Sequence, residues 1–406
     1  MKLALVVPSL SEGGGVPAVA EFIKDIAVNS KLWDLTIISL STSSNDPTSI
    51  SLLDPRTWFK KNHTKVGVWQ GIPYTHVGSY GREIEFQRYR KRRAIKNLIK
   101  EVDVVQVVCG SPAWANSVID YGKPVSLQVA TLAIIERKTK DARSANLVSY
   151  WRRCMSIITN YLDNQALRKV NAIQLENNWM LEYSKNVNIK RLVDIRYAPP
   201  GIDADIFRRG NNRNLIKGYI LSVARFSDPR KNINLLLRAY AELSPKIQSN
   251  FKLVLAGSSP PPNDFWELAI KLGMKSSITY IPRPSKLELV DIYQNAAVFS
   301  LTSNEEGLGI AILEAMACGI PVVCTQCGGP DGIITNNVDG YLSPIADYKS
   351  IAKNLTEILE NPEKNNRMGI AARKTIETRY SKEITGAEFL SVWSNLANTF
   401  KDTQKN

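Results

Sequence analysis

The chain has 406 residues, enough for about two domains, and its 44% apolar and 22% charged residues are typical of a globular protein. Its 52 lysines and arginines against 38 acidic residues give a formal net charge of +14. The sequence excludes low-complexity and solenoid-repeat classes, and its charge favours anionic partners: phosphates, nucleic acid or an acidic membrane surface.

The first segment predicts a buried strand at 3–7, a glycine-rich turn with Gly13, Gly14 and Gly15, and a helix over 17–29. This order is the phosphate-binding geometry of doubly wound sheets, although it departs from the G-x-G-x-x-G pattern. The first apolar run is too short for a signal peptide, and no run approaches the roughly 18 apolar residues of a membrane-spanning helix. We therefore expect a cytoplasmic protein.

Strands and helices alternate through the first half, apart from residues 41–80, for which no element is predicted. Strands are expected at 35–40, 102–108, 124–130, 172–175 and 195–198, and helices at 82–100, 144–168 and 178–185. Such alternation predicts a parallel sheet covered by helices on both faces.

The helix expected at 82–100 is strongly basic, with seven lysines or arginines from Arg88 to Lys100. Such a run is either a solvated helix face or a binding surface, and the overall charge leaves both interpretations open. As a binding surface, it predicts peripheral attachment to an anionic membrane on the inner face of the cell.

Two further motifs could be taken for metal sites. Cys324-x-x-Cys327 has the spacing of one zinc-binding pair, but no second pair or nearby histidine accompanies it, so small buried residues are favoured. Asp203-x-Asp205 is interpreted as part of a turn. We expect no metal site and, in this compartment, no disulfide.

The second half begins after a polar, basic crossover at 208–217. A strand at 219–223 leads to Arg225 and Lys231, and open parallel sheets bind ligands at the carboxyl ends of their strands. This position favours a phosphate-binding role for the two cations over plain surface charge. Further strands are expected at 251–256, 277–281 and 298–301, and helices at 233–243, 284–295, 347–360, 362–380 and 382–400.

Gly307, Leu308 and Gly309 precede an apolar helix, so backbone amides and the positive helix end meet at one point, which is a ready anion site. Glu306 and Glu314 bracket this site. Carboxylates repel phosphate unless they bind something else, and an ionised carboxylate accepts hydrogen bonds from vicinal hydroxyls. An anion flanked by two diols describes a sugar nucleotide.

Taken together, these segments resemble the family 4 retaining glycosyltransferases over nearly the whole chain. The stretch from Glu306 to Glu314, EGLGIAILE, matches the family's paired-glutamate motif in spacing and glycines, and the following AMACGIPVV matches its usual order. The segment from Leu221 to Arg225, with Lys231, resembles the family's donor-phosphate segment.

The resemblance implies an α/β fold with two facing Rossmann-like domains, the GT-B arrangement. Residues 1–200 would form an acceptor-side domain and residues 201–380 a nucleotide-sugar-binding domain. Residues 381–406 would form a C-terminal helix that crosses back to the N-terminal domain.

The resemblance also implies a role for each site residue. Arg225 and Lys231 would hold the donor diphosphate, Glu306 would contact the transferred sugar, and Glu314 would bind the ribose hydroxyls. The implied catalytic residues are Glu306, Arg225 and Lys231, and the implied donor-binding residues are Glu314, Gly307, Leu308, Gly309, Gly14 and Gly15. No metal or cofactor is expected, because fixed cations and helix-end amides stabilise the leaving group of a UDP- or GDP-linked sugar.

One feature departs from the family. Many members have a histidine at the end of a first-domain strand, near the transferred sugar, but the corresponding segment here, PVSLQVAT at 124–131, has none. His63 and His76 lie well upstream and are expected to be exposed loop residues. Two hypotheses account for its absence: a donor sugar that lacks a group the histidine would contact, or weakened catalysis.

The favoured function is a retaining, metal-independent hexosyltransferase that acts on a glycan or lipid-linked acceptor in surface polysaccharide biosynthesis. A sugar-nucleotide epimerase or isomerase of the same fold is the alternative, and it would convert the donor without any acceptor. A third hypothesis is a non-enzymatic, basic protein that binds nucleic acid or a membrane. It leaves the two glutamates unexplained, and no interleaved aromatic residues support a nucleic-acid partner.

Overall fold

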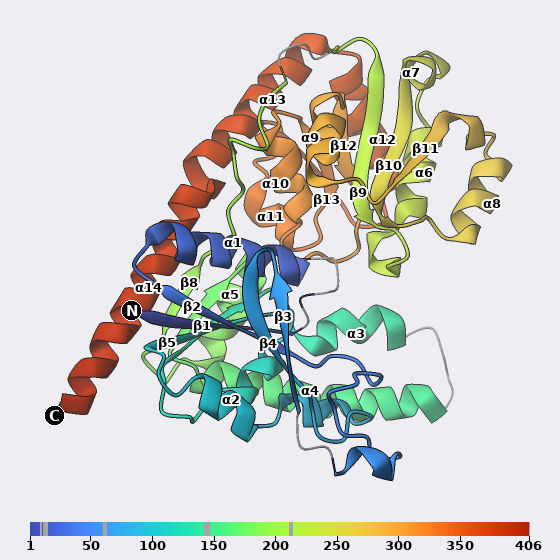
Figure 1. Ribbon diagram of the computed structural model, residues 1–406. Coiled ribbons are helices and arrows are strands. Elements are labelled where there is room, and N and C mark those ends of the chain that lie inside the picture. The colour runs from blue at the N-terminus through green and yellow to red at the C-terminus, as the bar shows by residue number, and fades with distance from the viewer. Residues whose placement is uncertain (9, 11–14, 60–62, 142–146, 211–213, 406) are drawn as a thin grey trace. The chain divides into compact units, whose positions relative to one another are not determined.

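The computed structural model describes residues 1–406 except 9, 11–14, 60–62, 142–146, 211–213 and 406 (Figure 1). The chain divides into two compact units. Unit 1 contains residues 1–200 and 386–406, and unit 2 contains residues 201–385.

Unit 1 is built on an eight-stranded sheet with the order β3-β4-β2-β1-β5-β6-β7-β8. Neighbouring strands are parallel except for the β3–β4 hairpin at the edge. The central strands are apolar and buried on both faces, as a parallel sheet covered by helices requires. The strands are β1 (Lys2–Pro8), β2 (Asp34–Leu40), β3 (Thr64–Trp69), β4 (Ile72–Val77), β5 (Val104–Cys109), β6 (Val125–Val129), β7 (Ala172–Leu175) and β8 (Asp194–Tyr197).

Helices and short 3₁₀ turns connect these strands. The α-helices are α1 (Gly15–Ser30), α2 (Arg93–Leu98), α3 (Ala133–Asp141), α4 (Leu147–Lys169) and α5 (Asn178–Val187), and the 3₁₀ turns are η1 (Pro55–Thr57), η2 (Glu85–Tyr89) and η3 (Pro112–Ser117). The long helix α14 (Lys382–Lys405) begins in unit 2, and from Gly386 onward it belongs to unit 1. There the buried Trp393 donates its indole N–H to Gln106 Oε1 of β5 at 2.7 Å.

The continuous basic helix predicted over 82–100 is wrong. The segment contains η2, an extended stretch and the short helix α2. Arg92 is the cause, because its backbone is extended and its side chain, only 3% exposed, donates to the carbonyl of Val77 at 3.2 Å. A helical Arg92 would lose this tertiary contact. The unassigned region 41–80 contains the hairpin of β3 and β4.

Unit 2 has a six-stranded, fully parallel sheet with the order β11-β10-β9-β12-β13-β14. Numbered within the unit, the order is 3-2-1-4-5-6, so the chain direction across the sheet reverses between β9 and β12. In such sheets ligands bind beyond the carboxyl ends of the strands at this switch point. The strands are β9 (Gly218–Arg225), β10 (Phe251–Ser259), β11 (Ile278–Pro282), β12 (Val298–Leu301), β13 (Val322–Thr325) and β14 (Gly340–Ser343).

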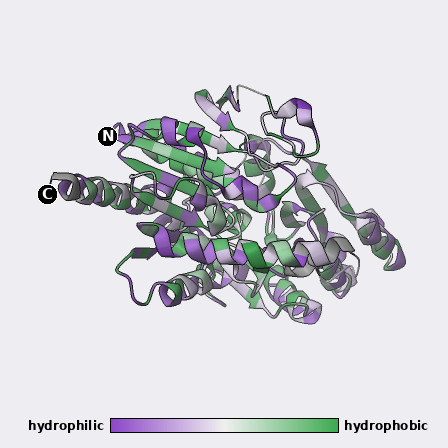
Figure 2. Cartoon of the chain, turned by 90° about the horizontal axis from the view of Figure 1, so that it is seen from below, coloured by the Kyte–Doolittle hydropathy of each residue, from purple (hydrophilic) through white to green (hydrophobic). Residues whose placement is uncertain are grey.

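The sheet of unit 2 is covered by helices whose apolar faces form its core. In Figure 2 the strands beside the N-terminus, in unit 1, are largely coloured as hydrophobic. The helices are α6 (Ile233–Ala241), α7 (Pro245–Asn250), α8 (Asn263–Lys271), α9 (Lys286–Gln294), α10 (Ile310–Ala317), α11 (Gly329–Ile333), α12 (Tyr348–Leu359) and α13 (Pro362–Thr375). Shorter turns are η4 (Pro229–Lys231), η5 (Lys275–Ser277) and the π-helical η6 (Ile376–Tyr380).

The predicted fold class, α/β with two Rossmann-like sheets, is confirmed by these two doubly wound units. Among the described residues, no helix combines the length and the apolar character needed to cross a bilayer.

Candidate active site

Two loops meet at the switch point of unit 2, one after β9 and one after β12. The backbone N–H of Asn304 donates to the carbonyl of Arg230 at 2.7 Å, and Thr302 Oγ1 donates to the carbonyl of Asn232 at 3.2 Å. Asn232 adopts a left-handed conformation with φ of 43°, and its Nδ2 donates to Asn304 Oδ1 at 3.0 Å. The two loops therefore form one connected frame at the carboxyl edge of the sheet.

This frame brings two of the predicted site residues into direct contact. Lys231 Nζ lies 2.6 Å from Glu306 Oε1, and the two side chains are only 17% and 9% exposed. Ser303 Oγ donates to the same carboxylate oxygen at 2.5 Å. An ammonium group is therefore held at the switch point by a largely buried carboxylate.

Arg225 lies apart from this pair, at the end of β9. Its side chain is 47% exposed, and its guanidinium is 3.6 Å from Asp228 Oδ2. Asp228 is bound more closely by Arg230, at 2.7 Å, and Arg230 also lies 3.7 Å from Glu305. Burial raises the pKa of Asp228, but the hydrogen bonds and charge of Arg230 outweigh burial and lower this pKa to about 2. Arg230 thus braces the loop, while Arg225 reaches toward solvent.

The start of α10 is shaped by two closely packed loops. The N–H of Glu306 donates to the carbonyl of Cys327 at 2.9 Å, and the N–H of Gly329 donates to the carbonyl of Glu306 at 3.0 Å. A Cβ on Gly329 would lie 2.3 Å from the carbonyl oxygen of Leu308, so only glycine permits this approach. Gly309 precedes α10 with φ of 90°. The three predicted amides, at 307–309, therefore lead directly into the helix.

Glu314 has different surroundings from Glu306. It lies within α10, and its Oε2 accepts a hydrogen bond from the hydroxyl of Tyr293 of α9 at 2.8 Å. Burial raises the pKa of Glu314 to about 7, although the Tyr293 hydrogen bond and the charge of Lys286 act in the opposite direction. Its protonation therefore changes near neutral pH.

The predicted glycine turn belongs to unit 1. Gly14 lies outside the described residues. Gly15 is the first residue of α1, after the end of β1, and β1 has β2 on one side and β5 on the other. Gly15 thus follows the strand at which the order of strands reverses in the sheet of unit 1.

The two motifs considered for metal binding have other roles. Cys324 and Cys327 are buried free thiols. Asp203 Oδ1 accepts hydrogen bonds from the backbone N–H groups of Asp205 and Ile206 at 3.1 and 3.0 Å, and its other oxygen pairs with Lys382 at 2.5 Å. Over the part of the chain that the structure describes, no group of three or more His, Cys, Asp or Glu residues could hold a metal ion.

Only some of the cations between Arg88 and Lys100 are exposed on the surface of the protein. The guanidinium groups of Arg88 and Arg92 donate to backbone carbonyls, and burial lowers the pKa of Arg92 to about 10. Lys91 pairs with Asp120 at 3.0 Å. The exposed cations of this segment are Arg90, Lys91, Arg93, Lys96 and Lys100.

The expectation that His76 is an exposed loop residue is also wrong. It lies on β4, is 21% exposed, and contacts Ser39 Oγ at 3.2 Å and Asp46 Oδ1 at 3.3 Å. His63 is half-buried, and its ring packs edge-on against Tyr80.

Sequence reasoning missed two residues that hold the site together. Ser303 orients the carboxylate of Glu306, and Arg230 connects the two loops through its carbonyl and its side chain. A polar residue three positions before Glu306, directly after a buried strand, was the available signal for Ser303. Asp228, two positions before Arg230, is a local partner, but the contacts of Arg230 with Asn304 and Glu305 come from the loop after another strand and left no local signal.

Residues 203–375 match the model of a family described as "Glycosyl transferases group 1". A D-inositol 3-phosphate glycosyltransferase of Saccharomonospora viridis is 28% identical over 224 residues, covering 52% of this chain and 52% of that protein. A probable sucrose-phosphate synthase of Thermosipho melanesiensis is 27% identical over 222 residues, covering 52% and 51%. The matches therefore span about half the length of these curated relatives.

Solved structures share the fold over nearly the whole chain. A sucrose-phosphate synthase from Thermosynechococcus elongatus superposes with a TM-score of 0.72 at 18% identity, covering 98% of this chain and 99% of that one. Anabaena Alr3699/HepE in complex with UDP-glucose gives 0.70 at 13% identity, with coverages of 97% and 100%. At these identities the likeness shows the fold alone.

Proposed function

We propose that this chain, which belongs to the group 1 glycosyl transferases through residues 203–375, transfers a hexose from a nucleoside-diphosphate sugar to a glycan or lipid-linked acceptor. The observation that carries the proposal is the ion pair of Lys231 and Glu306, 2.6 Å apart at the switch point of unit 2, beside the start of α10. A fixed cation, helix-end amides and a carboxylate at one point suit a diphosphate joined to a sugar.

In the proposed reaction the anomeric C–O bond breaks, and the nucleoside diphosphate leaves with the bonding electrons. Lys231, Arg225 and the amides at 307–309 would stabilise the growing negative charge on the leaving group, so no metal ion is required. Glu306, released from Lys231 as the diphosphate binds, would accept hydrogen bonds from the sugar. We propose retention of the anomeric configuration.

Glu314 would accept hydrogen bonds from the hydroxyls of the ribose. The turn with Gly14 and Gly15 would face the diphosphate or the acceptor. The base is proposed to be uracil or guanine. UDP-glucose is a natural first donor to test, since the Anabaena structural neighbour was crystallised with it.

The acceptor side of the proposal is a cytoplasmic enzyme of surface polysaccharide biosynthesis, peripheral to the inner face of the membrane. The net charge of +14 and the exposed cations between Arg88 and Lys100 support an anionic surface as partner. No nucleic-acid partner is proposed.

The experiment that tests the donor assignment is a thermal-shift panel of nucleoside diphosphates and their sugars. A ligand that binds only the folded state raises the melting temperature with concentration, so the correct base stands out. Failure of every UDP and GDP compound to shift the transition would contradict the proposal. Once a donor is known, conversion of that donor in the absence of acceptor would favour the epimerase alternative.

A further inference from the structure

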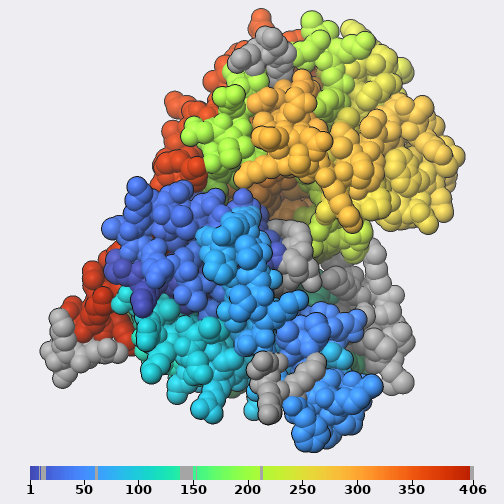
Figure 3. All heavy atoms as spheres, viewed as in Figure 1, coloured from blue at the N-terminus to red at the C-terminus, as the bar shows by residue number. Residues whose placement is uncertain are grey.

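A short loop of unit 1 exposes four large apolar side chains. Between β2 and β3, Leu52, Leu53, Trp58 and Phe59 are 49%, 84%, 53% and 87% exposed. Scattered single apolar residues are normal on protein surfaces, but four exposed within eight positions of one loop are a concentration that indicates a binding partner. We call these four residues the apolar knob. In Figure 3 the segment around residue 50, in blue, projects from the body of unit 1.

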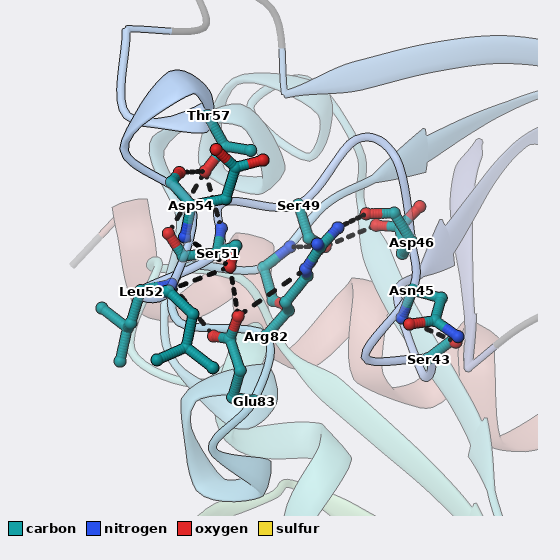
Figure 4. Close-up of polar contacts among 12 residues, drawn as sticks. Ser43, Asn45, Asp46, Ser49, Ser51, Leu52, Asp54, Thr57, Arg82 and Glu83 are labelled. Atoms are coloured by element: carbon teal, nitrogen blue, oxygen red, sulfur yellow. Dashed lines mark hydrogen bonds and ion pairs between the residues drawn. The ribbon is translucent and has the colours of Figure 1, made fainter.

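The loop that carries the knob is held in shape by its own polar groups (Figure 4). Ser51 Oγ accepts hydrogen bonds from the N–H groups of Leu53 and Asp54 at 3.2 and 3.1 Å, and the N–H of Ser51 donates to Thr57 Oγ1 at 2.9 Å. Trp58 donates its indole N–H to the carbonyl of Ser51 at 2.7 Å. The polar groups are therefore satisfied inside the loop while the apolar side chains remain outside.

The base of the loop is fixed to the rest of unit 1. Glu83 accepts the N–H of Leu52 at 3.0 Å and the hydroxyl of Ser51 (Figure 4). The guanidinium of Arg82 donates to the carbonyl of Asp46 at 3.1 Å, and the carboxylate of Asp46 accepts from Thr48 and from Ser49. These hydrogen bonds attach the loop that carries the knob to the rest of unit 1, so the exposure of its side chains is a feature of the folded loop.

Two exposed cations lie near the knob. The side chain of Arg56, inside the loop, is 91% exposed, and its Nε donates to Asp54 Oδ1 at 3.0 Å. The side chains of Leu52 and Gln87 both lie beside Gly81, and Gln87 Oε1 accepts a hydrogen bond from the exposed Arg90. One exposed cation therefore lies within the loop and a second is linked to its Leu52 through Gln87, on a chain whose net charge is +14.

We propose that the apolar knob inserts into the headgroup region of an anionic lipid bilayer, with Arg56 and Arg90 contacting lipid phosphates. Aromatic and aliphatic side chains beside cations suit that interface, where each basic residue near the surface adds electrostatic attraction. A stable protein interface takes about 20–30 residues a side, so four protruding side chains fit a bilayer better than a protein partner. The proposal rests on the membrane attachment of the proposed function, and it assigns the main membrane contact to this loop instead of the basic segment.

Vesicle co-sedimentation of the full chain tests the proposal. The variant is Leu53→Ser with Phe59→Ser, and its matched control is Ile189→Ser with Leu192→Ser, a pair in the same unit whose side chains are 80% and 105% exposed. On phosphatidylcholine vesicles containing phosphatidylglycerol, we expect the knob variant to bind at least about tenfold more weakly than wild type, and the control to bind as wild type. Arg56→Gln with Arg90→Gln should weaken binding and reduce its salt dependence.

Three outcomes would overturn the proposal: unchanged binding of the knob variant, equal weakening in the control pair, or equal binding to vesicles without phosphatidylglycerol. Dissociation of a dimer in the knob variant, without vesicle binding by wild type, would instead identify a second copy of the chain as the partner. A melting temperature of the knob variant equal to that of wild type, measured without ligand, confirms its fold. Nucleoside diphosphate is then added to the same variant. This addition separates the two proposals, because donor binding can fail while vesicle binding persists, and the reverse.

Discussion

Replacing one member of the Lys231–Glu306 pair should cost both stability and turnover. The two groups are 2.6 Å apart and 17% and 9% exposed, so either single replacement leaves a charge that is largely buried and unpaired. Breaking a buried pair typically costs about 3–5 kcal/mol, and the residual exposure of this pair places the expectation near 3 kcal/mol. For a unit of this size that corresponds to a fall in melting temperature of about 6–12 °C.

The double variant Lys231→Met with Glu306→Gln separates stability from function. With both charges removed, the free energy of unfolding should return to within about 1 kcal/mol of wild type. Turnover should stay about 10²–10³-fold low in the double variant, because the cation proposed to face the leaving group is gone.

The assays are calorimetric unfolding of the three variants and release of nucleoside diphosphate from the donor identified by thermal shift. A double variant as unstable as the sum of the singles would show that the two charges are not coupled. A double variant with restored turnover would show that the pair is structural and takes no part in the reaction.

Three further predictions follow from the same site. Burial raises the pKa of Glu314 to about 7, and the ionised carboxylate is the stronger acceptor because both of its oxygens accept and neither donates. Nucleotide affinity should therefore rise as pH rises through 7, and calorimetric titration of Glu314→Gln should show no such dependence. Gly329→Ala should lower the melting temperature and turnover, since its Cβ would lie 2.3 Å from a carbonyl oxygen, whereas Gly110→Ala, with nothing within 4 Å, should leave the melting temperature unchanged. Because the pKa of Asp228 is lowered to about 2, the stabilisation that its carboxylate provides is present above pH 4 and is lost as the pH falls toward 2. Arg230→Ala should lower the free energy of unfolding by about 2 kcal/mol at neutral pH, as measured by urea unfolding.

The sequence predicted most strands of both sheets, because buried parallel strands are continuous apolar runs. It missed the short β14, whose segment was interpreted as a turn. It did not predict the β3–β4 hairpin, whose turn at Gln70 and Gly71 takes positive φ at both residues, 48° and 80°, without the usual Asn-Gly signal. The helix at 82–100 failed for a different reason. Its charge pattern suited a solvated helix, and the burial of Arg92 against Val77 depends on tertiary contacts that no local pattern encodes.

In the candidate site, too, local features could be predicted and contacts between distant residues could not. The spacing of Glu306 and Glu314, with the glycines between them, could be recognised because it is local. The contact of Lys231 with Glu306 joins residues 75 positions apart, and it depends on β9 and β12 being neighbours in the sheet. Sequence position suggested that both residues serve the donor, but their direct ion pair could not be foreseen.

The central claim is that Lys231 and Arg225 bind the diphosphate of a nucleotide sugar. The most direct measurement is calorimetric titration with a nucleoside diphosphate and with the matching nucleoside, on wild type, Lys231→Ala and Arg225→Ala. We predict that wild type binds the diphosphate far more tightly than the nucleoside, and that each variant loses at least about tenfold of this difference while nucleoside affinity is unchanged. An unchanged preference for the diphosphate in both variants would contradict the account.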